Sequence, residues 1–179
     1  MRELADEIRS IIGELAANTV PPGKEEHALA LARELRALLD GPRRERWYDG
    51  LIDGTGIQTS IDDPVSPFLA HGAFRGTENP VAPPLVITDE VRDDGTRVKV
   101  GHVTLNLAYE GPPHGVHGGF VAASFDEILG AAQSMSGLPA MTGTLTIRYR
   151  KPTPLHRELR FEGELVKVEG RKVFAEGRV

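Results

Sequence analysis

The segment His117-Gly118-Gly119, followed by Asp126, contains the residue types that acyl-group chemistry requires. The glycine pair stands at the predicted start of a helix, where free backbone N–H groups can stabilise a developing negative charge. Glycine suits this position because a Cβ atom would obstruct the approach of a ligand to the backbone. Asp126 lies in an otherwise apolar segment, and a carboxylate in apolar surroundings resists ionisation. Together these features supply half of what the hydrolysis of an acyl group requires.

The spacing of these groups predicts a site that is shared between two chains. A helix rises about 1.5 Å per residue, so Asp126 would lie about 12 Å further along the axis than the helix start. One carbonyl group cannot contact both groups across that distance. We therefore expect the reacting carbon to lie between the helix start of one subunit and Asp126 of another, at a dimer interface.

Each of these residues also has a structural interpretation. Asp126 could be a buried polar residue that is hydrogen-bonded to backbone or threonine groups, and His117 could be only the residue that caps the helix. His114 and His117 are three residues apart, a spacing that metal ligands can have, but the segment offers no obvious third ligand. We therefore predict no metal site.

A basic cluster follows the predicted helix. Its members are Arg148, Arg150, Lys151 and Arg157. Two interpretations remain open for it: a solvated strand end, or an electrostatic seat for a phosphate-bearing group such as coenzyme A.

The elements that precede this region are helical and then irregular. Apolar residues recur with helical spacing before and after Val20-Pro21-Pro22-Gly23, which predicts two helices within residues 1–40. We interpret them as an extension that covers part of the core or a partner subunit, and a regulatory or docking role remains the alternative. Residues 41–84 are rich in glycine and proline, and we expect a long irregular connection there.

From Leu85 onward the pattern predicts strands and one long helix. The predicted strands cover residues 85–91, 96–107, 142–150, 159–168 and 172–179. In the second of these, the apolar phase shifts at Gly101, which predicts a β-bulge. Antiparallel strands around one buried helix define an α+β fold.

The predicted helix covers residues 118–136 and has two distinct faces. Its apolar stripe consists of Val121, Phe125, Ile128, Leu129 and Ala132, and its other face consists of Ala122, Asp126, Gly130 and Gln133. After the helix and the later strands, the chain ends at Val179, within a predicted strand. Because this would leave an unpaired sheet edge, we expect a further strand or a neighbouring subunit to cover it.

Composition excludes several classes of protein. The chain has 179 residues, a formal net charge of −5 and no cysteine. The length suits one domain with a sizeable core, the negative charge argues against a nucleic-acid binder, and the lack of cysteine excludes disulfides and thiol nucleophiles. No apolar run approaches the roughly 20 residues that span a membrane, and we identify no secretion signal. We therefore expect a cytoplasmic protein with neither nucleic-acid nor membrane partners.

Two blocks of sequence resemble the hotdog-fold acyl-CoA thioesterases, most closely their PaaI-like branch. The first block covers residues 109–119 and continues to Asp126, and the second covers residues 141–152. The resemblance extends over residues 79–179, the predicted thioesterase domain, and leaves 1–78 as an N-terminal helical extension and irregular connection. It implies a curved antiparallel sheet wrapped around one long central helix, with two subunits that pair their sheets edge to edge.

The resemblance also implies roles for individual residues. Asp126 corresponds to the general base or nucleophile that acts on the thioester. The backbone N–H of Gly118 or Gly119 corresponds to the group that polarises the thioester carbonyl. Thr142 corresponds to a residue that positions the attacking water, and His117 to one that helps to orient the thioester.

The expected activity is the hydrolysis of acyl-CoA by a homodimer or a dimer of dimers. Ser124 is a second candidate, beside Thr142, for holding the water, and Arg148, Arg150 and Lys151 would bind the substrate through its coenzyme A phosphates. Coenzyme A enters only as part of the substrate, so we expect no separate cofactor. Two alternatives remain open: a hotdog-fold enoyl-CoA hydratase or dehydratase, and a non-catalytic acyl-CoA-binding module.

Overall fold

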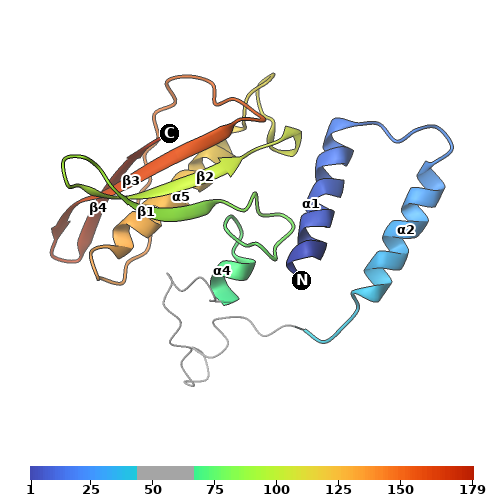
Figure 1. The fold of residues 1–179 in the computed structure, drawn as a ribbon, viewed down its shortest axis with the longest axis horizontal. Coiled ribbons are helices and arrows are strands. Elements are labelled where there is room, and N and C mark those ends of the chain that lie inside the picture. The colour runs from blue at the N-terminus through green and yellow to red at the C-terminus, as the bar shows by residue number, and fades with distance from the viewer. Residues whose placement is uncertain (44–66) are drawn as a thin grey trace.

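An antiparallel sheet packs against one long helix in the part of the chain that the structure describes (Figure 1). The structure is a computed structural model that describes residues 1–43 and 67–179. The elements are, in chain order, α1 (Arg2–Ala17), α2 (Glu25–Leu38), α4 (Pro67–His71), β1 (Val86–Val91), β2 (Arg97–Thr104), η1 (Leu107–Tyr109), α5 (Gly118–Ser134), β3 (Glu158–Glu169) and β4 (Lys172–Arg178). The strands lie in the order β1-β2-β3-β4, and each neighbouring pair is antiparallel.

Two of the predicted strand pairs form as hairpins. Strands β1 and β2 are joined through Gly95, and β3 and β4 through Gly170; both glycines have positive φ, at 85° and 59°. Glycine adopts this backbone conformation without the steric cost that a Cβ atom would add. A glycine in each turn therefore allows the chain to reverse direction between the paired strands.

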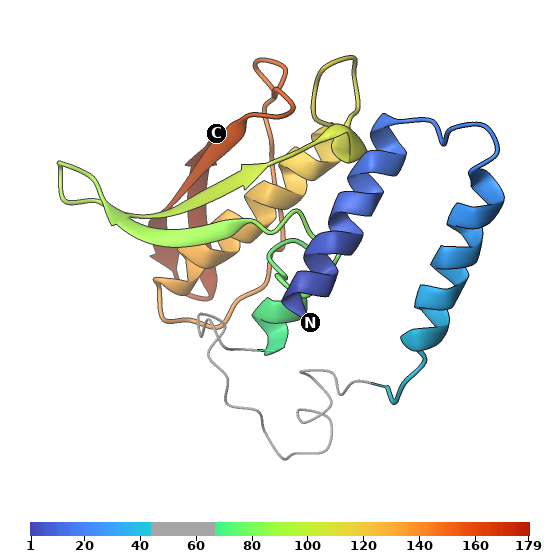
Figure 2. The ribbon, with the colours of Figure 1, turned by 45° about the vertical axis from the view of Figure 1, so that its right-hand side comes forward.

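Helix α5 lies across the inner face of the sheet (Figure 2). Its predicted apolar stripe is confirmed: Val121, Ile128 and Ala132 are buried, while Phe125 and Leu129 are partly buried against the same core. The Phe125 ring packs edge-on against the ring of Phe161 in β3, with centroids 5.1 Å apart. This burial positions the opposite face of α5, which carries Asp126, away from the core.

Two glycines in the sheet allow α5 to approach closely. Gly163 in β3 and Gly177 in β4 are cross-strand partners beneath the helix. A Cβ atom at Gly163 would lie 3.1 Å from the carbonyl oxygen of Ile128. A Cβ atom at Gly177 would lie 2.6 Å from the carbonyl oxygen of Glu162 and 3.1 Å from Cδ2 of Leu129. Side chains at these positions would push the strand and the helix apart.

The predicted β-bulge at Gly101 is wrong. Strand β2 pairs without a register shift with both neighbours, and the irregularity of the sheet lies in β3 between Leu165 and Lys167. The apolar phase shifts because β2 is buried on both faces: Val98 and Val100 lie on the outer face, whereas Val103 faces the helix. A strand with two buried faces needs no bulge to carry apolar residues in both phases.

An ion-pair network covers the outer face of the sheet. At its centre is the buried carboxylate of Glu162, which lies opposite Val100 in β2. Glu162 accepts hydrogen bonds from Arg92, from Nη1 of Arg160 at 2.7 Å and from Nη2 of Arg178 at 3.0 Å. The methylene stems of long charged side chains can cover apolar surface in this way while their charged groups remain paired.

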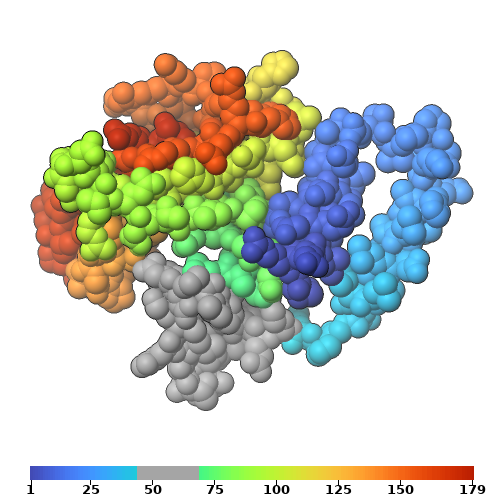
Figure 3. All heavy atoms as spheres, in the orientation of Figure 1, coloured from blue at the N-terminus to red at the C-terminus, as the bar shows by residue number. Residues whose placement is uncertain are grey.

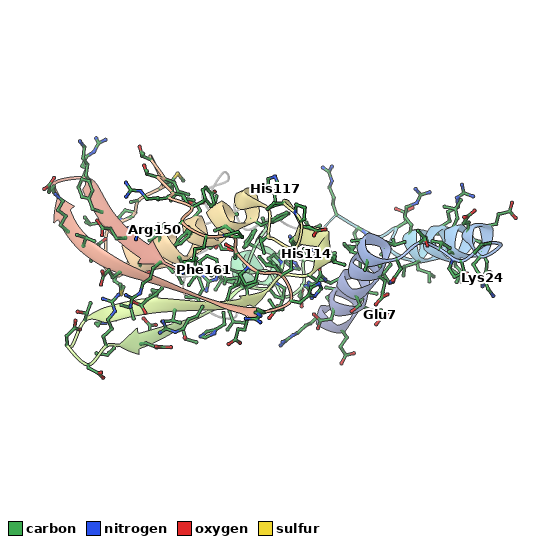
Figure 4. All side chains as sticks on the ribbon, turned by 90° about the horizontal axis from the view of Figure 1, so that it is seen from above. Glu7, Lys24, His114, His117, Arg150 and Phe161 are labelled. Atoms are coloured by element: carbon green, nitrogen blue, oxygen red, sulfur yellow. The ribbon has the colours of Figure 1, made fainter. Side chains whose placement is uncertain are left out.

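The predicted N-terminal helices are confirmed, but only one of them packs on the body of the molecule. Arg9 of α1 donates from Nε to the carbonyl oxygen of Ala82 at 2.7 Å and from Nη2 to that of Asn79 at 3.0 Å. Helix α2 has no buried residue. An opening separates it from α1 in the space-filling view (Figure 3), and from above both helices extend to one side of the sheet (Figure 4).

The prediction of a strand over residues 142–150 is not confirmed. Leu145 and Ile147 are partly buried and alternate with exposed residues, as the sequence pattern suggests. However, the segment forms no ladder with any strand that the structure describes, because β4 pairs only with β3. Most of the predicted irregular connection, residues 44–66, lies outside the described residues. None of the described helices is long and apolar enough to cross a membrane.

Candidate active site

The start of α5 is fixed by His117, its N-cap residue. The His117 side chain accepts a hydrogen bond at Nδ1 from the N–H of Gly119, at 3.0 Å. The His117 carbonyl accepts from the N–H of Phe120 at 2.9 Å. Capping by a side-chain acceptor satisfies one of the backbone donors that every helix start leaves open. His117 therefore has a clear structural role, and its exposed side chain lies at the start of α5 (Figure 4).

The two glycines at the helix start are not equivalent. The N–H of Gly119 is engaged by the His117 ring. The N–H of Gly118 forms no hydrogen bond with any residue that the structure describes. Gly118 is the first residue of α5, where the backbone donor adds to the positive end of the helix dipole. Of the two predicted donors, Gly118 is the one that remains available to a ligand.

Asp126 lies on the exposed face of α5 and has one specific partner. Thr142 donates from Oγ1 to Oδ1 of Asp126 at 2.7 Å, across 16 residues of sequence. The expectation that apolar surroundings enclose this carboxylate is not met within one chain, because the buried face of the helix is the one that carries Val121 and Ile128. Asp126 and Thr142 form an exposed pair at which a water molecule or ligand could bind.

The structure does not bring Ser124 to this pair. Ser124 is fully buried, and its hydroxyl donates to the carbonyl oxygen of Phe120 one turn earlier, at 2.9 Å. Two residues along a helix differ by about 200° in direction, so Ser124 and Asp126 point to opposite sides of α5. The prediction that Ser124 holds a water beside Asp126 has no support in this placement, because its hydroxyl faces the core.

A second carboxylate lies next to Asp126. Glu127 is partly buried, and this burial raises its pKa. Arg75 opposes the increase through its positive charge, and the neighbouring Asp126 adds to it. No sequence pattern marks Glu127, since its environment depends on the segment around Arg75, which packs near α5 only in the folded chain.

The predicted basic cluster is exposed and carries no ion pair to a described carboxylate. Arg148, Arg150 and Lys151 follow Thr142 on the same segment, and Arg157 lies beyond them. Their charges are thus available to an anionic ligand. Within residues 1–43 and 67–179, no three His, Cys, Asp or Glu side chains gather closely enough to hold a metal ion.

Helix geometry separates the two halves of the candidate site. Gly118 and Asp126 belong to one continuous helix. The rise of an α-helix places them about 12 Å apart along its axis. Within one chain, therefore, the open N–H of Gly118 and the Asp126–Thr142 pair form two separate half-sites.

Comparison with known proteins places this arrangement in a family. A family model described as the thioesterase superfamily matches residues 114–179, which include both half-sites. The crystal structure of protein RHA08564, a thioesterase superfamily protein, superposes on 98% of this chain and 84% of that chain. The two share 31% sequence identity and a TM-score of 0.76. This chain belongs to the thioesterase superfamily. The predicted α+β hotdog fold, with helices at its N-terminus, is thereby confirmed.

Two curated relatives match a shorter part of the chain. The acyl-coenzyme A thioesterase THEM4 of Xenopus laevis is 40% identical over 65 residues, which is 36% of this chain and 29% of that protein. The acyl-coenzyme A thioesterase THEM4 of Mus musculus is 41% identical over 68 residues, which is 38% of this chain and 29% of that protein. The matched region thus spans less than a third of the length of these relatives.

Proposed function

We propose that this chain is an acyl-CoA thioesterase of the PaaI-like branch, and that its active site forms between two copies of the chain. The observation that carries the proposal is the hydrogen bond between Thr142 and Asp126 in a member of the thioesterase superfamily. An exposed carboxylate with a hydroxyl partner can act as the general base: the two groups hold a water molecule, and the carboxylate takes its proton. The curated relatives named as acyl-coenzyme A thioesterases support the choice of substrate class.

In the proposed reaction, the thioester carbonyl oxygen accepts a hydrogen bond from the N–H of Gly118 in one protomer. Asp126 of the other protomer takes a proton from a water held with Thr142, and the water oxygen attacks the carbonyl carbon. The carbon–sulfur bond then breaks, and the proton passes from Asp126 to the leaving thiolate. The products are a carboxylic acid and the free coenzyme A thiol. Direct attack by the Asp126 carboxylate, followed by hydrolysis of the anhydride, is the alternative route.

The basic cluster provides a binding surface for the coenzyme A part of the substrate. Arg148, Arg150 and Lys151 are exposed cations with no described carboxylate partner. Guanidinium and ammonium groups bind phosphate through charge-assisted hydrogen bonds. We assign these residues to the phosphates of coenzyme A, which enters as part of the substrate and leaves as product.

Free-thiol release from a panel of short, long and aromatic acyl-CoA thioesters tests the activity. The Gly118 donor is tested by comparing Gly118→Pro with Gly118→Ala. Proline lacks the N–H but is favoured at the first position of a helix, and the extended backbone of His117, at φ −59° and ψ 130°, suits a residue before proline. Alanine adds a Cβ atom and keeps the N–H. We expect kcat to fall about 100-fold more in Gly118→Pro than in Gly118→Ala, as removal of an oxyanion donor does.

Mixed dimers test whether the two half-sites come from different protomers. Gly118→Pro and Asp126→Asn chains with different tags are co-expressed, and the dimers that carry both tags are purified. If the site is shared, each mixed dimer has one intact site and should recover about half of the wild-type activity. Mixed dimers as inactive as their parents would show that both residues act within one protomer. No thiol release from any thioester by the wild type would refute the proposed activity.

A further inference from the structure

Tyr149 makes a specific contact with the glycine at the start of α5. Its hydroxyl donates to the carbonyl oxygen of Gly118 at 2.9 Å, across 31 residues of sequence. Its ring also lies close against the glycine: a Cβ atom at Gly118 would be 3.3 Å from Cζ and 3.3 Å from the hydroxyl oxygen of Tyr149. The side chain therefore both bonds to Gly118 and forms a wall beside it.

This contact completes the fixation of one peptide group. The carbonyl of Gly118 and the N–H of Gly119 belong to the same planar peptide unit. Tyr149 holds the carbonyl end, and Nδ1 of His117 holds the N–H end at 3.0 Å. The preceding peptide unit is held through the His117 carbonyl, which accepts from Phe120. The N–H of Gly118 belongs to that preceding unit. Because the peptide units on both sides of the Gly118 Cα atom are held, this N–H, which stays open, has a fixed direction.

Fixation matters here because the two residues concerned are glycines. Glycine has access to a wider range of φ and ψ than any other residue, so a Gly-Gly step at a helix start is the part of the helix most able to rotate. A hydrogen-bond donor stabilises a transition state best when it is oriented before the reaction, since no energy is then spent on reorganisation. A fixed partner for the Gly118 carbonyl offsets the freedom that the glycines introduce.

The segment that carries Tyr149 also carries Thr142. Residues 142–150 form no ladder with a described strand, yet their two ends are tied to α5: Thr142 to Asp126, and Tyr149 to Gly118. Through these two side chains, the segment contacts both the Asp126 carboxylate and the backbone of Gly118. We infer that Tyr149 is a positioning residue that holds the Gly118 N–H in the direction needed to receive the thioester oxygen. This inference rests on the proposed thioesterase function.

The substitution Tyr149→Phe removes the hydroxyl and keeps the ring. We expect kcat for acyl-CoA hydrolysis to fall about 10-fold while KM changes less than about 2-fold, because orientation of the donor affects the transition state more than substrate binding. Tyr109→Phe is the matched control. Tyr109 is buried, and its hydroxyl has no hydrogen bond to a described residue. Its loss should leave kcat unchanged.

A double-mutant cycle separates positioning from a general structural role. If Tyr149 acts through the Gly118 N–H, then Tyr149→Phe should have no further effect on kcat in the Gly118→Pro background, where that N–H is absent. An equal loss in both backgrounds, a change confined to KM, or an unchanged kcat in Tyr149→Phe would overturn the inference. The proposed function fails in a different way, by absence of thiol release or by equal activities of Gly118→Pro and Gly118→Ala.

Discussion

The hydroxyl of Thr142 lies 2.7 Å from the Asp126 carboxylate and donates a hydrogen bond to it. Sixteen residues separate the two along the chain, so the contact exists only because the segment after α5 turns back along the helix. A threonine hydroxyl can donate to one oxygen and accept from a water at the same time. The pair can therefore hold a water molecule within reach of the carboxylate.

Replacement of Thr142 should show which property of the side chain matters. Thr142→Ala removes the hydroxyl, and we expect kcat to fall about 10- to 100-fold because the attacking water loses one of its partners. Thr142→Ser keeps the hydroxyl and should retain kcat within about 3-fold. Steady-state assays of thiol release measure both. Equal kcat values for the alanine and serine variants would contradict a role for the hydroxyl.

Substitution of the two adjacent acids should separate their roles. Asp126→Asn keeps the shape of the side chain but removes its basicity, and we expect kcat to fall about 100-fold or more. Because Asp126 is exposed, the melting temperature should change little. Glu127→Gln is the matched comparison at the next residue, and a fall in kcat of less than about 5-fold is expected, since no part of the proposed mechanism uses it. A near-normal turnover of Asp126→Asn would remove Asp126 from the mechanism.

The Glu162 network should make stability depend on pH. Its hydrogen bond with Arg160, and those with Arg92, lower the pKa of Glu162 in the folded state. A carboxylate whose folded pKa is depressed stabilises the protein above its unfolded pKa, and this contribution is lost as the pH falls through the folded pKa. We expect Glu162→Gln to lower the free energy of unfolding by about 1–3 kcal/mol at pH 7.

That difference between wild type and Glu162→Gln should begin to shrink as the pH falls below about 4, where the carboxylate becomes protonated in the unfolded chain. It should go on shrinking until the pH lies below the depressed folded pKa, where the carboxylate is protonated in the folded protein as well. Urea denaturation between pH 7 and pH 3 measures it. Glu169→Gln serves as the control, since Glu169 forms an exposed pair with Lys167 in the β3–β4 hairpin and such pairs contribute little. A difference that stays constant with pH would argue against the network as its source.

A methyl group added beneath α5 should destabilise the fold. The Cβ atom of Gly177→Ala would lie 2.6 Å from the carbonyl oxygen of Glu162, so the β3–β4 pairing has to shift. We expect a loss of about 1–3 kcal/mol, typical of overpacking. Gly143→Ala is the control, because a Cβ atom at Gly143 meets nothing within 4 Å. Chemical denaturation of both variants gives the comparison, and equal stabilities would show that the sheet adapts at no cost.

Sequence periodicity predicted the elements whose signals are local. The stripe through Val121 and Ile128 determines which face of α5 is buried, and glycines at positive φ determine where the hairpins turn. The sequence also led to the helix start at Gly118 and to a second helix face that carries Asp126. It placed this carboxylate in apolar surroundings, however, whereas the structure exposes it. Each of these features depends on neighbouring residues in the chain, so their physical causes are visible in the sequence.

The features that periodicity missed depend on partners far along the chain. Residues 142–150 alternate as a strand does, but a strand also requires a backbone neighbour, which no pattern within the segment can reveal. The apolar phase change at Gly101 has its cause on the outer face, where Glu162 lies opposite Val100. Likewise, the sequence predicts Tyr149 only as part of the strand over residues 142–150. Its contact with Gly118 emerged once the segment was placed against the helix.

Helix α2 differs from the rest of the described chain in how its backbone should exchange protons with solvent. It has 14 residues, none of them buried, and an isolated helix of this length is marginally stable in water. Its amide hydrogens should therefore exchange with deuterium through local fraying, within the dead time of a manual experiment. Amides in the centre of α5, which is held between core and sheet, should exchange only through opening of the whole domain. Deuterium uptake would thus distinguish the amides of α2, which exchange by fraying, from those in the centre of α5, which exchange only when the domain opens.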